Sequence, residues 1–281
     1  MQGVYHSRAD YQPQESPMPD QYVLVEKRDG VAVMTLNRPE RLNALIPPLN
    51  DAIEQTAHDL GQQDDVRVVV VTGAGKGFCS GADVKGWENA PPGSAARPPR
   101  RELTAPSSQL VLPFRQMTKP VIGAINGVAG GAGFSLAMAC DIRIASESAR
   151  FASLFIHRGI APNNGVSWTL PRLMGPAKAL EWMLTGEWID AKTAESLGIV
   201  NRVVPQAELM TVAMELAKKI AAMPPIAAEL TKKAVYRGLA QDLLPHLDLE
   251  THYQKVCFGT EDFKESTQAF LEKRPPKFKG R

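Results

Sequence analysis

Cysteine is scarce in this chain: Cys79, Cys140 and Cys257 are the only three among 281 residues, and they lie far apart. Their spacing matches neither a CxxC metal-binding pattern nor a disulfide framework. We therefore expect no metal site and no disulfide-stapled fold, and the pattern is typical of a protein from a reducing compartment.

An excess of charge of one sign is also missing. The formal net charge is +2, from 32 basic and 30 acidic residues, and the basic residues do not form blocks. A nucleic-acid-binding protein would carry a basic patch. We therefore expect the partners to be small molecules or copies of the same chain, and no nucleic acid.

Long apolar runs are lacking as well. No run reaches the length of a membrane span. The N-terminus has no basic stretch followed by an apolar segment, and Asp10, Glu15 and Asp20 argue against a transit peptide. The sequence therefore predicts no membrane association and a cytoplasmic location.

What the chain does have is an alternation of strand and helix signals. Residues 1–20 are polar and rich in Pro and Gln, which predicts a flexible extension. Within residues 21–209, Asp29-Gly30 marks a hairpin, and Val66–Thr72 is a β-branched run typical of a strand buried on both faces. Strand signals stop before residues 210–281, where helical patterns follow. The chain is therefore expected to be α/β with a helical C-terminal region.

Two glycine-rich turns lie within this pattern: GAGKGFCSGAD at 73–83 and GGAGFSLAMACD at 130–141. The first has Gly77 where a phosphate loop needs Ser or Thr, and the second has Leu136 where a dinucleotide fold needs its third glycine. The two turns could instead present the backbone N–H groups of Ala82 and Ala132 to one oxygen, as an oxyanion hole. Alternatively, the glycines only permit tight packing, and spacing leaves both interpretations open.

A resemblance favours the oxyanion hole. The blocks NRPERLNAL, FCSGADVK, KPVIGAINGVAGGAGFSLAMACDIRIASESARF, LPRLMGPAKALEWMLTGEWIDAKTAESLGIVNRVVP and AFLEKR occur in this order. They resemble the crotonase (enoyl-CoA hydratase/isomerase) superfamily over residues 21–275. The resemblance implies a crotonase-like spiral of ββα units with a helical C-terminal trimerisation region, in a homotrimer or a hexamer of two trimers. It also implies an acyl-CoA thioester substrate, with coenzyme A as part of the substrate and no separate cofactor.

The sequence departs from the hydratase pattern where catalysis is concerned. Ser135 and Phe155 stand where hydratases of the family carry two glutamates, and Asn163 stands where some isomerases carry an aspartate. Without these carboxylates, efficient hydration is not expected. Double-bond isomerisation, cleavage of a C–C or thioester bond, and acyl-CoA binding without catalysis remain as alternatives.

Other side chains are candidates for the missing chemistry. His157 would share a face with Phe155 if that segment were extended, and could act as a base, although most lone histidines are structural. Ser135 and Asn163 could contribute polar contacts. Cys79 could be a nucleophile, but packing is the simpler interpretation.

Ligand-binding positions follow from the resemblance. It assigns Lys85, and Phe270 and Lys273 of a neighbouring subunit, to the nucleotide end of coenzyme A. Asp83 belongs to the same turn as Lys85 and is a further candidate, either at the coenzyme A site or, with Glu88 and Glu102, as a surrogate carboxylate. Aromatic residues expected to line an apolar acyl pocket are Trp87, Phe114 and Phe155.

Overall fold

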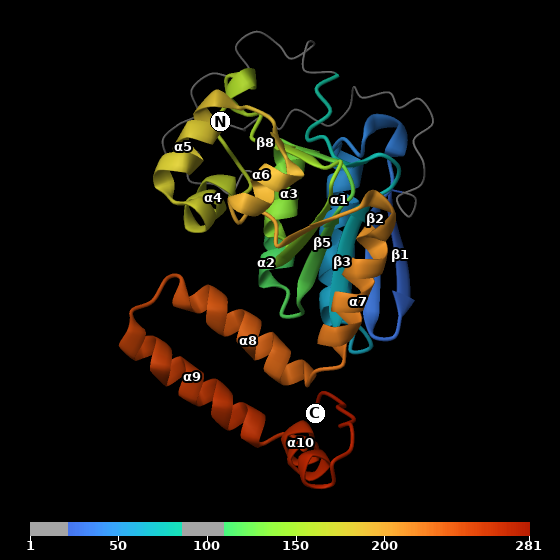
Figure 1. Cartoon of the computed structure of the whole chain (residues 1–281), viewed down its shortest axis with the longest axis vertical. Helices are drawn as coiled ribbons and strands as arrows, with labels where there is room; N and C mark the ends of the chain where they lie inside the picture. The colour runs from blue at the N-terminus through green and yellow to red at the C-terminus, as the bar shows by residue number, and fades with distance from the viewer. Residues whose placement is uncertain (1–21, 86–109) are drawn as a thin grey trace, which may run out of the picture.

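The computed structural model describes residues 22–85 and 110–281 (Figure 1). The expected extension at 1–20 lies outside these residues. The strands are β1 (Val23–Arg28), β2 (Val31–Leu36), β3 (Val68–Gly73), β4 (Gly77–Cys79), β5 (Val121–Ile125), β6 (Val128–Gly130), β7 (Ile142–Ser146), β8 (Arg150–Ala152), β9 (Ile189–Asp190) and β10 (Arg202–Val204). The helices are η2 (Pro39–Arg41), α1 (Pro47–Gln62), α2 (Leu112–Gln116), α3 (Ala132–Ala139), η5 (Ile156–Arg158), α4 (Val166–Met174), α5 (Pro176–Thr185), α6 (Ala191–Ser196), η6 (Gln206–Glu208), α7 (Leu209–Ala221), α8 (Pro225–Gly238), α9 (Leu243–Phe258) and α10 (Glu261–Leu271).

The described part of the chain begins with the expected hairpin. Strands β1 and β2 pair antiparallel, and Arg28 lies opposite Val31. Asp29 and Gly30 between them both have positive φ, 54° and 77°, as a two-residue turn that follows the strand twist requires.

The strands form two sheets, and the chain winds between them. The larger sheet has the order β1-β2-β3-β5-β7-β10, and the smaller one has the order β4-β6-β8-β9. Strand β3 in the large sheet leads to β4 in the small one, and β5–β6 and β7–β8 repeat this step. Neighbouring strands of successive turns pair in parallel. This is the spiral that the resemblance implies.

Strand β3 lies at the centre of the packing, as its β-branched run predicts. Val69 and Val71 face a core shared with α1, α3 and the small sheet, whereas Val68 and Val70 face a second core under α7. All six residues of β3 are buried. Because successive side chains of a strand point to opposite faces, an uninterrupted apolar run is what a strand covered on both sides needs.

Helices alone follow β10 in the described chain. α7 covers the outer face of the large sheet, and α8, α9 and α10 then lead away to the opposite end of the molecule from α5 and β8 (Figure 1). Among the described residues, no helix is both long and apolar enough to cross a membrane.

Candidate active site

The two glycine-rich turns meet at the carboxyl ends of β4 and β6, which are paired neighbours in the small sheet. A Cβ atom added to Gly81 would lie 2.6 Å from the carbonyl oxygen of Gly130 and 3.5 Å from the amide nitrogen of Ala132. A Cβ at Gly133 would collide with the Cys79 carbonyl oxygen. The glycines are therefore needed for contact between the turns, since no side chain fits where the backbones approach.

This contact brings together the two turns that carry the amides of Ala82 and Ala132. Leu45 bridges the first turn by donating its amide to Gly81 and accepting from Asp83, so the Ala82 amide between them faces away from Leu45. Ala132 is the first residue of α3, where helical N–H groups have no partner within the helix. Neither amide donates a hydrogen bond to another described residue. Ala82 is exposed and Ala132 is half-buried, so neither residue is enclosed in the core.

The helix adds a favourable field at this point. All seven residues from Gly133 to Ala139 are buried, so α3 is surrounded by core rather than by water. A helix N-terminus carries a partial positive charge, and a low-dielectric surrounding screens it little. The arrangement suits an oxygen that gains negative charge during a reaction.

An ion pair fixes the turn that carries Ala82. Arg38 donates to the Asp83 carboxylate at 2.8 Å and to the Ala44 carbonyl at 3.0 Å, and the Lys85 amide donates to the same carboxylate at 3.2 Å. Partial burial acts to raise the pKa of Asp83, but the hydrogen bonds from Arg38 and Lys85 outweigh it and hold the pKa below its ordinary value. Asp83 is thus placed as a brace of the turn.

Two asparagines brace the loop that leads into this turn, and sequence reasoning missed both. Asn43 is fully buried, and its side-chain amide donates to the carbonyls of Gly77 and Phe78 at 2.8 and 3.1 Å. Asn126 donates to the carbonyl of Gly73 at 2.8 Å and accepts from its amide at 3.2 Å. The only signal in the sequence is a polar residue beside apolar neighbours, which does not reveal its partners.

Ser135 and Asn163, two separate candidates from the sequence, lie close together in the structure. The Ser135 side chain is 1% exposed, and its hydroxyl lies 3.2 Å from the Asn163 carbonyl oxygen and 3.4 Å from that of Gly131. Its single proton is therefore directed to backbone acceptors. The Asn163 side-chain oxygen accepts from Asn164 at 2.9 Å.

The condition under which His157 would share a face with Phe155 is not met, because its segment is not extended. Phe155 to Arg158 turn into the 3-10 helix η5, so Phe155 is buried at 5% exposure while His157 is exposed. The His157 ring nitrogen Nε2 lies 2.8 Å from the Thr185 carbonyl at the end of α5. The ring also packs against Gly186. The structure thus gives His157 a partner in α5 and a different environment from Phe155.

Two further candidates belong to the core. Phe114 of α2 is fully buried and packs in the larger core cluster. Cys79 is fully buried, and burial raises the pKa of its thiol to about 12, against a smaller opposing effect of the Gly81 backbone. A thiol that stays protonated is a poor nucleophile, so packing is its role. Trp87, Glu88 and Glu102 lie outside the described residues.

The residues assigned to the nucleotide end of coenzyme A are all exposed. Lys85 follows the Ala82 turn directly. Phe270 is 83% exposed in the last turn of α10, and Lys273 follows that helix. Helix α10 lies at the opposite end of the long axis from β8 (Figure 1).

A separate hollow of about 650 Å³ lies over β1 to β3 beside α7. Its lining includes Val33, Thr35, Met210 and Met214, and also Gly73 and Asn126 of the braced loop, but none of the residues that the sequence predicts for the site. The candidate site is therefore placed by the two glycine-rich turns and not by this hollow.

Comparison with known proteins agrees with this geometry. The family model described as enoyl-CoA hydratase/isomerase matches residues 26–281. The chain is 36% identical over 261 residues to the 1,2-epoxyphenylacetyl-CoA isomerase of Escherichia coli K12, covering 93% of this chain and 99% of that protein. It is 38% identical over 255 residues to the short-chain-enoyl-CoA hydratase of Clostridium acetobutylicum, covering 90% and 95%.

Solved structures give the same result. The enoyl-CoA hydratase of Bacillus anthracis superposes with a TM-score of 0.81 at 36% identity, covering 93% of this chain and all of that one. The enoyl-CoA hydratase of Polaromonas sp. JS666 gives 0.82 at 30% identity, covering 91% and 99%. The fold, the paired glycine-rich turns and these matches together establish that the chain is an enzyme of the enoyl-CoA hydratase/isomerase family, with the crotonase fold.

Proposed function

We propose that this enzyme binds an acyl-CoA thioester and stabilises its enolate, with the thioester oxygen held by the amides of Ala82 and Ala132. The observation that carries the proposal is the close approach of Gly81 to Gly130 and Ala132, together with two amides that donate to no other described residue. Removing one such donor from an oxyanion hole costs about 10²–10³ in rate. Coenzyme A enters as part of the substrate, and no separate cofactor is needed for this step.

The reaction that follows the enolate depends on the acid and base groups around it, and the side chains argue against efficient hydration. Ser135 and Phe155 occupy the positions of the two hydratase glutamates, and neither side chain is a base at neutral pH. The Ser135 hydroxyl is moreover directed to the backbone at Asn163. We favour double-bond isomerisation, or cleavage of a C–C or thioester bond, since these use the same enolate with different proton transfers. Relatives named as an isomerase and as a hydratase are similarly close, so names do not separate these reactions.

A second candidate function is acyl-CoA binding without catalysis. The observation in its favour is that Ser135, Phe155 and Asn163 stand at three positions where members of the family carry carboxylates, while the two glycine-rich turns are kept. Proton transfer by a positioned side chain contributes roughly 10²–10⁴ in rate, so its loss could leave a binding protein.

For the nucleotide end of coenzyme A, we propose Lys85 together with Phe270 and Lys273 of a neighbouring copy in a trimer or a hexamer. A lysine suits a phosphate as a compact point charge. The exposure of Phe270, 83%, supports a role outside its own chain. A cytoplasmic location is part of this proposal, supported by three cysteines that are all free.

The decisive experiment incubates the purified protein in heavy water with 2-enoyl-, 3-enoyl- and aryl-acyl-CoA thioesters, followed by mass spectrometry. We expect deuterium at the α-carbon without gain of water. Gain of one water at an efficient rate would instead establish hydration and refute our reading of Ser135 and Phe155. Tight binding of a thioester with no incorporation of deuterium into any of them would favour the second candidate function, acyl-CoA binding without catalysis.

A further inference from the structure

The last turn of α10 ends in an unusual backbone conformation at Lys273. Its φ is 53°, in the left-handed region, and the Lys273 and Arg274 amides donate to the carbonyls of Phe270 and Ala269 at 3.2 and 3.0 Å. This is the common helix-ending motif in which the left-handed position is usually glycine. A lysine is less favourable than a glycine in this backbone conformation. Its presence therefore points either to a role of its side chain or to contacts that stabilise the turn.

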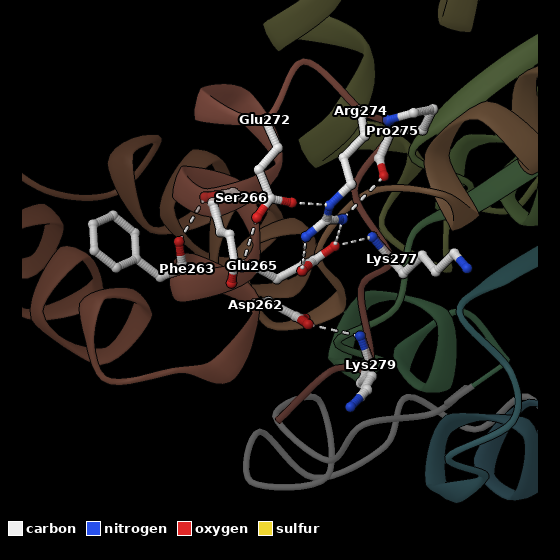
Figure 2. A network of polar contacts seen from close by, with 10 residues as sticks. Asp262, Phe263, Glu265, Ser266, Glu272, Arg274, Pro275, Lys277 and Lys279 are labelled. Atoms are coloured by element: carbon white, nitrogen blue, oxygen red, sulfur yellow. Dashed lines mark hydrogen bonds and ion pairs between the residues drawn. The ribbon is translucent and has the colours of Figure 1, made fainter.

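The residues after this turn fold back along α10 (Figure 2). Arg274 donates two hydrogen bonds to the Glu265 carboxylate, at 2.6 and 2.9 Å, and one to Glu272 at 2.5 Å. Glu265 also accepts from the Lys277 amide at 2.7 Å. Hydrogen bonds from Arg274 and then from the Lys277 amide lower the pKa of Glu265 to about 2, so the carboxylate is charged at neutral pH.

The other end of this segment is fixed to α10 and to the core. Asp262, which is 3% exposed, accepts from the amides of Lys279 and Gly280 at 2.6 and 2.8 Å. Arg67, just before β3, donates to the Phe278 carbonyl at 2.9 Å and to that of Ala221 at 3.0 Å. Residues 274–281 thus form a strap, here called the C-terminal strap, that joins α10 to the end of α7 and to the large sheet.

The C-terminal strap holds the last turn of α10, which is not held by burial of its side chains. Phe270 and Leu271 in the last turn of α10 are 83% and 74% exposed, so packing within the chain does little to hold them. Helix ends without such support fray. Because Glu265 lies two turns before Arg274, their paired hydrogen bonds span the helix end and fix the turn between them.

We propose that Glu265 and Arg274 are positioning residues for coenzyme A binding. By closing the C-terminal strap, they hold the turn at Lys273 so that Phe270 and Lys273 are presented in a fixed geometry to ligand on a neighbouring copy. This inference rests on the proposed function, in which those two side chains contact the nucleotide end.

The test compares two probes that differ only in the nucleotide. Calorimetric titration of the full chain uses butyryl-CoA and butyryl-pantetheine, with the variants Glu265→Gln and Arg274→Lys. Arg274→Lys keeps the charge but loses the two-pronged geometry, so it tests the strap even if one variant is unstable. Glu215→Gln, on the exposed surface of α7, is the matched control for the charge change. Thermal melts and sedimentation verify folding and assembly.

We expect Glu265→Gln and Arg274→Lys to weaken butyryl-CoA binding by roughly three- to tenfold, while butyryl-pantetheine binding and the control stay unchanged. In a Lys273→Met background the same changes should have a smaller effect, because the Lys273 charge is already gone and only the Phe270 contact remains to be positioned. Two results would reduce the C-terminal strap to a purely structural role. One is an equal loss of affinity for both probes, and the other is the same loss of butyryl-CoA affinity in the Lys273→Met background as in the unmodified protein.

The proposed function can fail separately. The unmodified protein could bind butyryl-CoA more tightly than butyryl-pantetheine, while the Glu265→Gln variant binds butyryl-CoA with the same affinity as the unmodified protein. In that case only the positioning role is overturned. If the unmodified protein binds both probes equally, the nucleotide contact itself is wrong and the positioning role falls with it.

Discussion

Gly81 shows how a single residue decides whether the two turns can form one site. Its φ is 97°, and a Cβ would lie 2.6 Å from the Gly130 carbonyl oxygen, which is backbone and cannot move aside cheaply. Both the backbone conformation and the space therefore select glycine.

Gly81→Ala is expected to destabilise the fold by about 3 kcal/mol, from overpacking together with the left-handed backbone. Equilibrium urea unfolding measures the change. Gly61→Ala is the matched control, since Gly61 lies in α1 and its added Cβ would meet only ordinary contact at 3.7 Å from Met117. The control should be neutral or stabilising. Similar values for the two variants would contradict the close approach of the turns.

Thiol chemistry gives a second test at the residue scale. Burial raises the pKa of both the Cys79 and the Cys140 thiols to about 12, whereas Cys257 is half-buried. In the folded protein at pH 8, we expect Ellman's reagent to modify Cys257 alone, and all three thiols after denaturation. Rapid modification of Cys79 in the folded state would restore the nucleophile interpretation.

Single residues also show where sequence reasoning stops. Ser135 and Asn163 were separate candidates, and nothing in the sequence indicated that the Ser135 hydroxyl would donate to the Asn163 backbone carbonyl. His157 would share a face with Phe155 only if this segment were extended. The backbone instead turns at η5, and the His157 ring contacts the Thr185 carbonyl. A short 3-10 helix has no hydrophobic period that would reveal it beforehand.

At the scale of elements, the helical C-terminal region is joined to the sheets through a buried charge. Lys232 of α8 forms an ion pair of 2.8 Å with Asp141 and donates to the carbonyls of Phe114 and Lys119. Tyr236, one turn later, donates to the same carboxylate at 2.7 Å. Desolvation lowers the pKa of Lys232, with Asp141 opposing this shift.

Lys232→Ala is therefore expected to destabilise the protein by about 3–5 kcal/mol, because it leaves a largely buried carboxylate without its cation. Urea unfolding again measures this. The adjacent Lys233 is exposed, so Lys233→Ala should change the stability by no more than about 0.5 kcal/mol. A small effect at Lys232 would mean that Tyr236 and the Val121 amide, at 2.7 Å, satisfy Asp141 by themselves.

At the scale of the whole molecule, the helices beyond α7 carry large apolar side chains that residues 22–85 and 110–281 do not cover. Leu243 and Leu244 at the start of α9 are 70% and 75% exposed, and Val235 of α8 is 59% exposed. Exposed apolar surface of this kind marks association sites. It agrees with the trimer or hexamer proposed above.

Leu244→Glu is expected to shift the protein toward smaller species, since it places a charge in a surface that association would bury. Sedimentation velocity over a range of concentrations measures the effect. Gln55→Glu on the exposed side of α1 adds the same charge elsewhere and should leave assembly unchanged. A protein that is monomeric throughout would refute the proposed assembly and, with it, the shared coenzyme A site.

The sequence by itself determined the elements and the kind of fold. The β-branched run of β3, the Asp29-Gly30 turn and the glycine-rich turns are local patterns, and local backbone and burial preferences act on them without knowledge of the rest of the chain. What only the tertiary structure decided is which of these residues meet. Arg38 pairs with Asp83. The side chains of Asn43 and Asn126 hold one loop, and residues 274–281 contact α10 and Arg67. Such partners lie far apart in the chain, and their pairing leaves no periodic trace in the sequence because it depends on how the spiral stacks its turns.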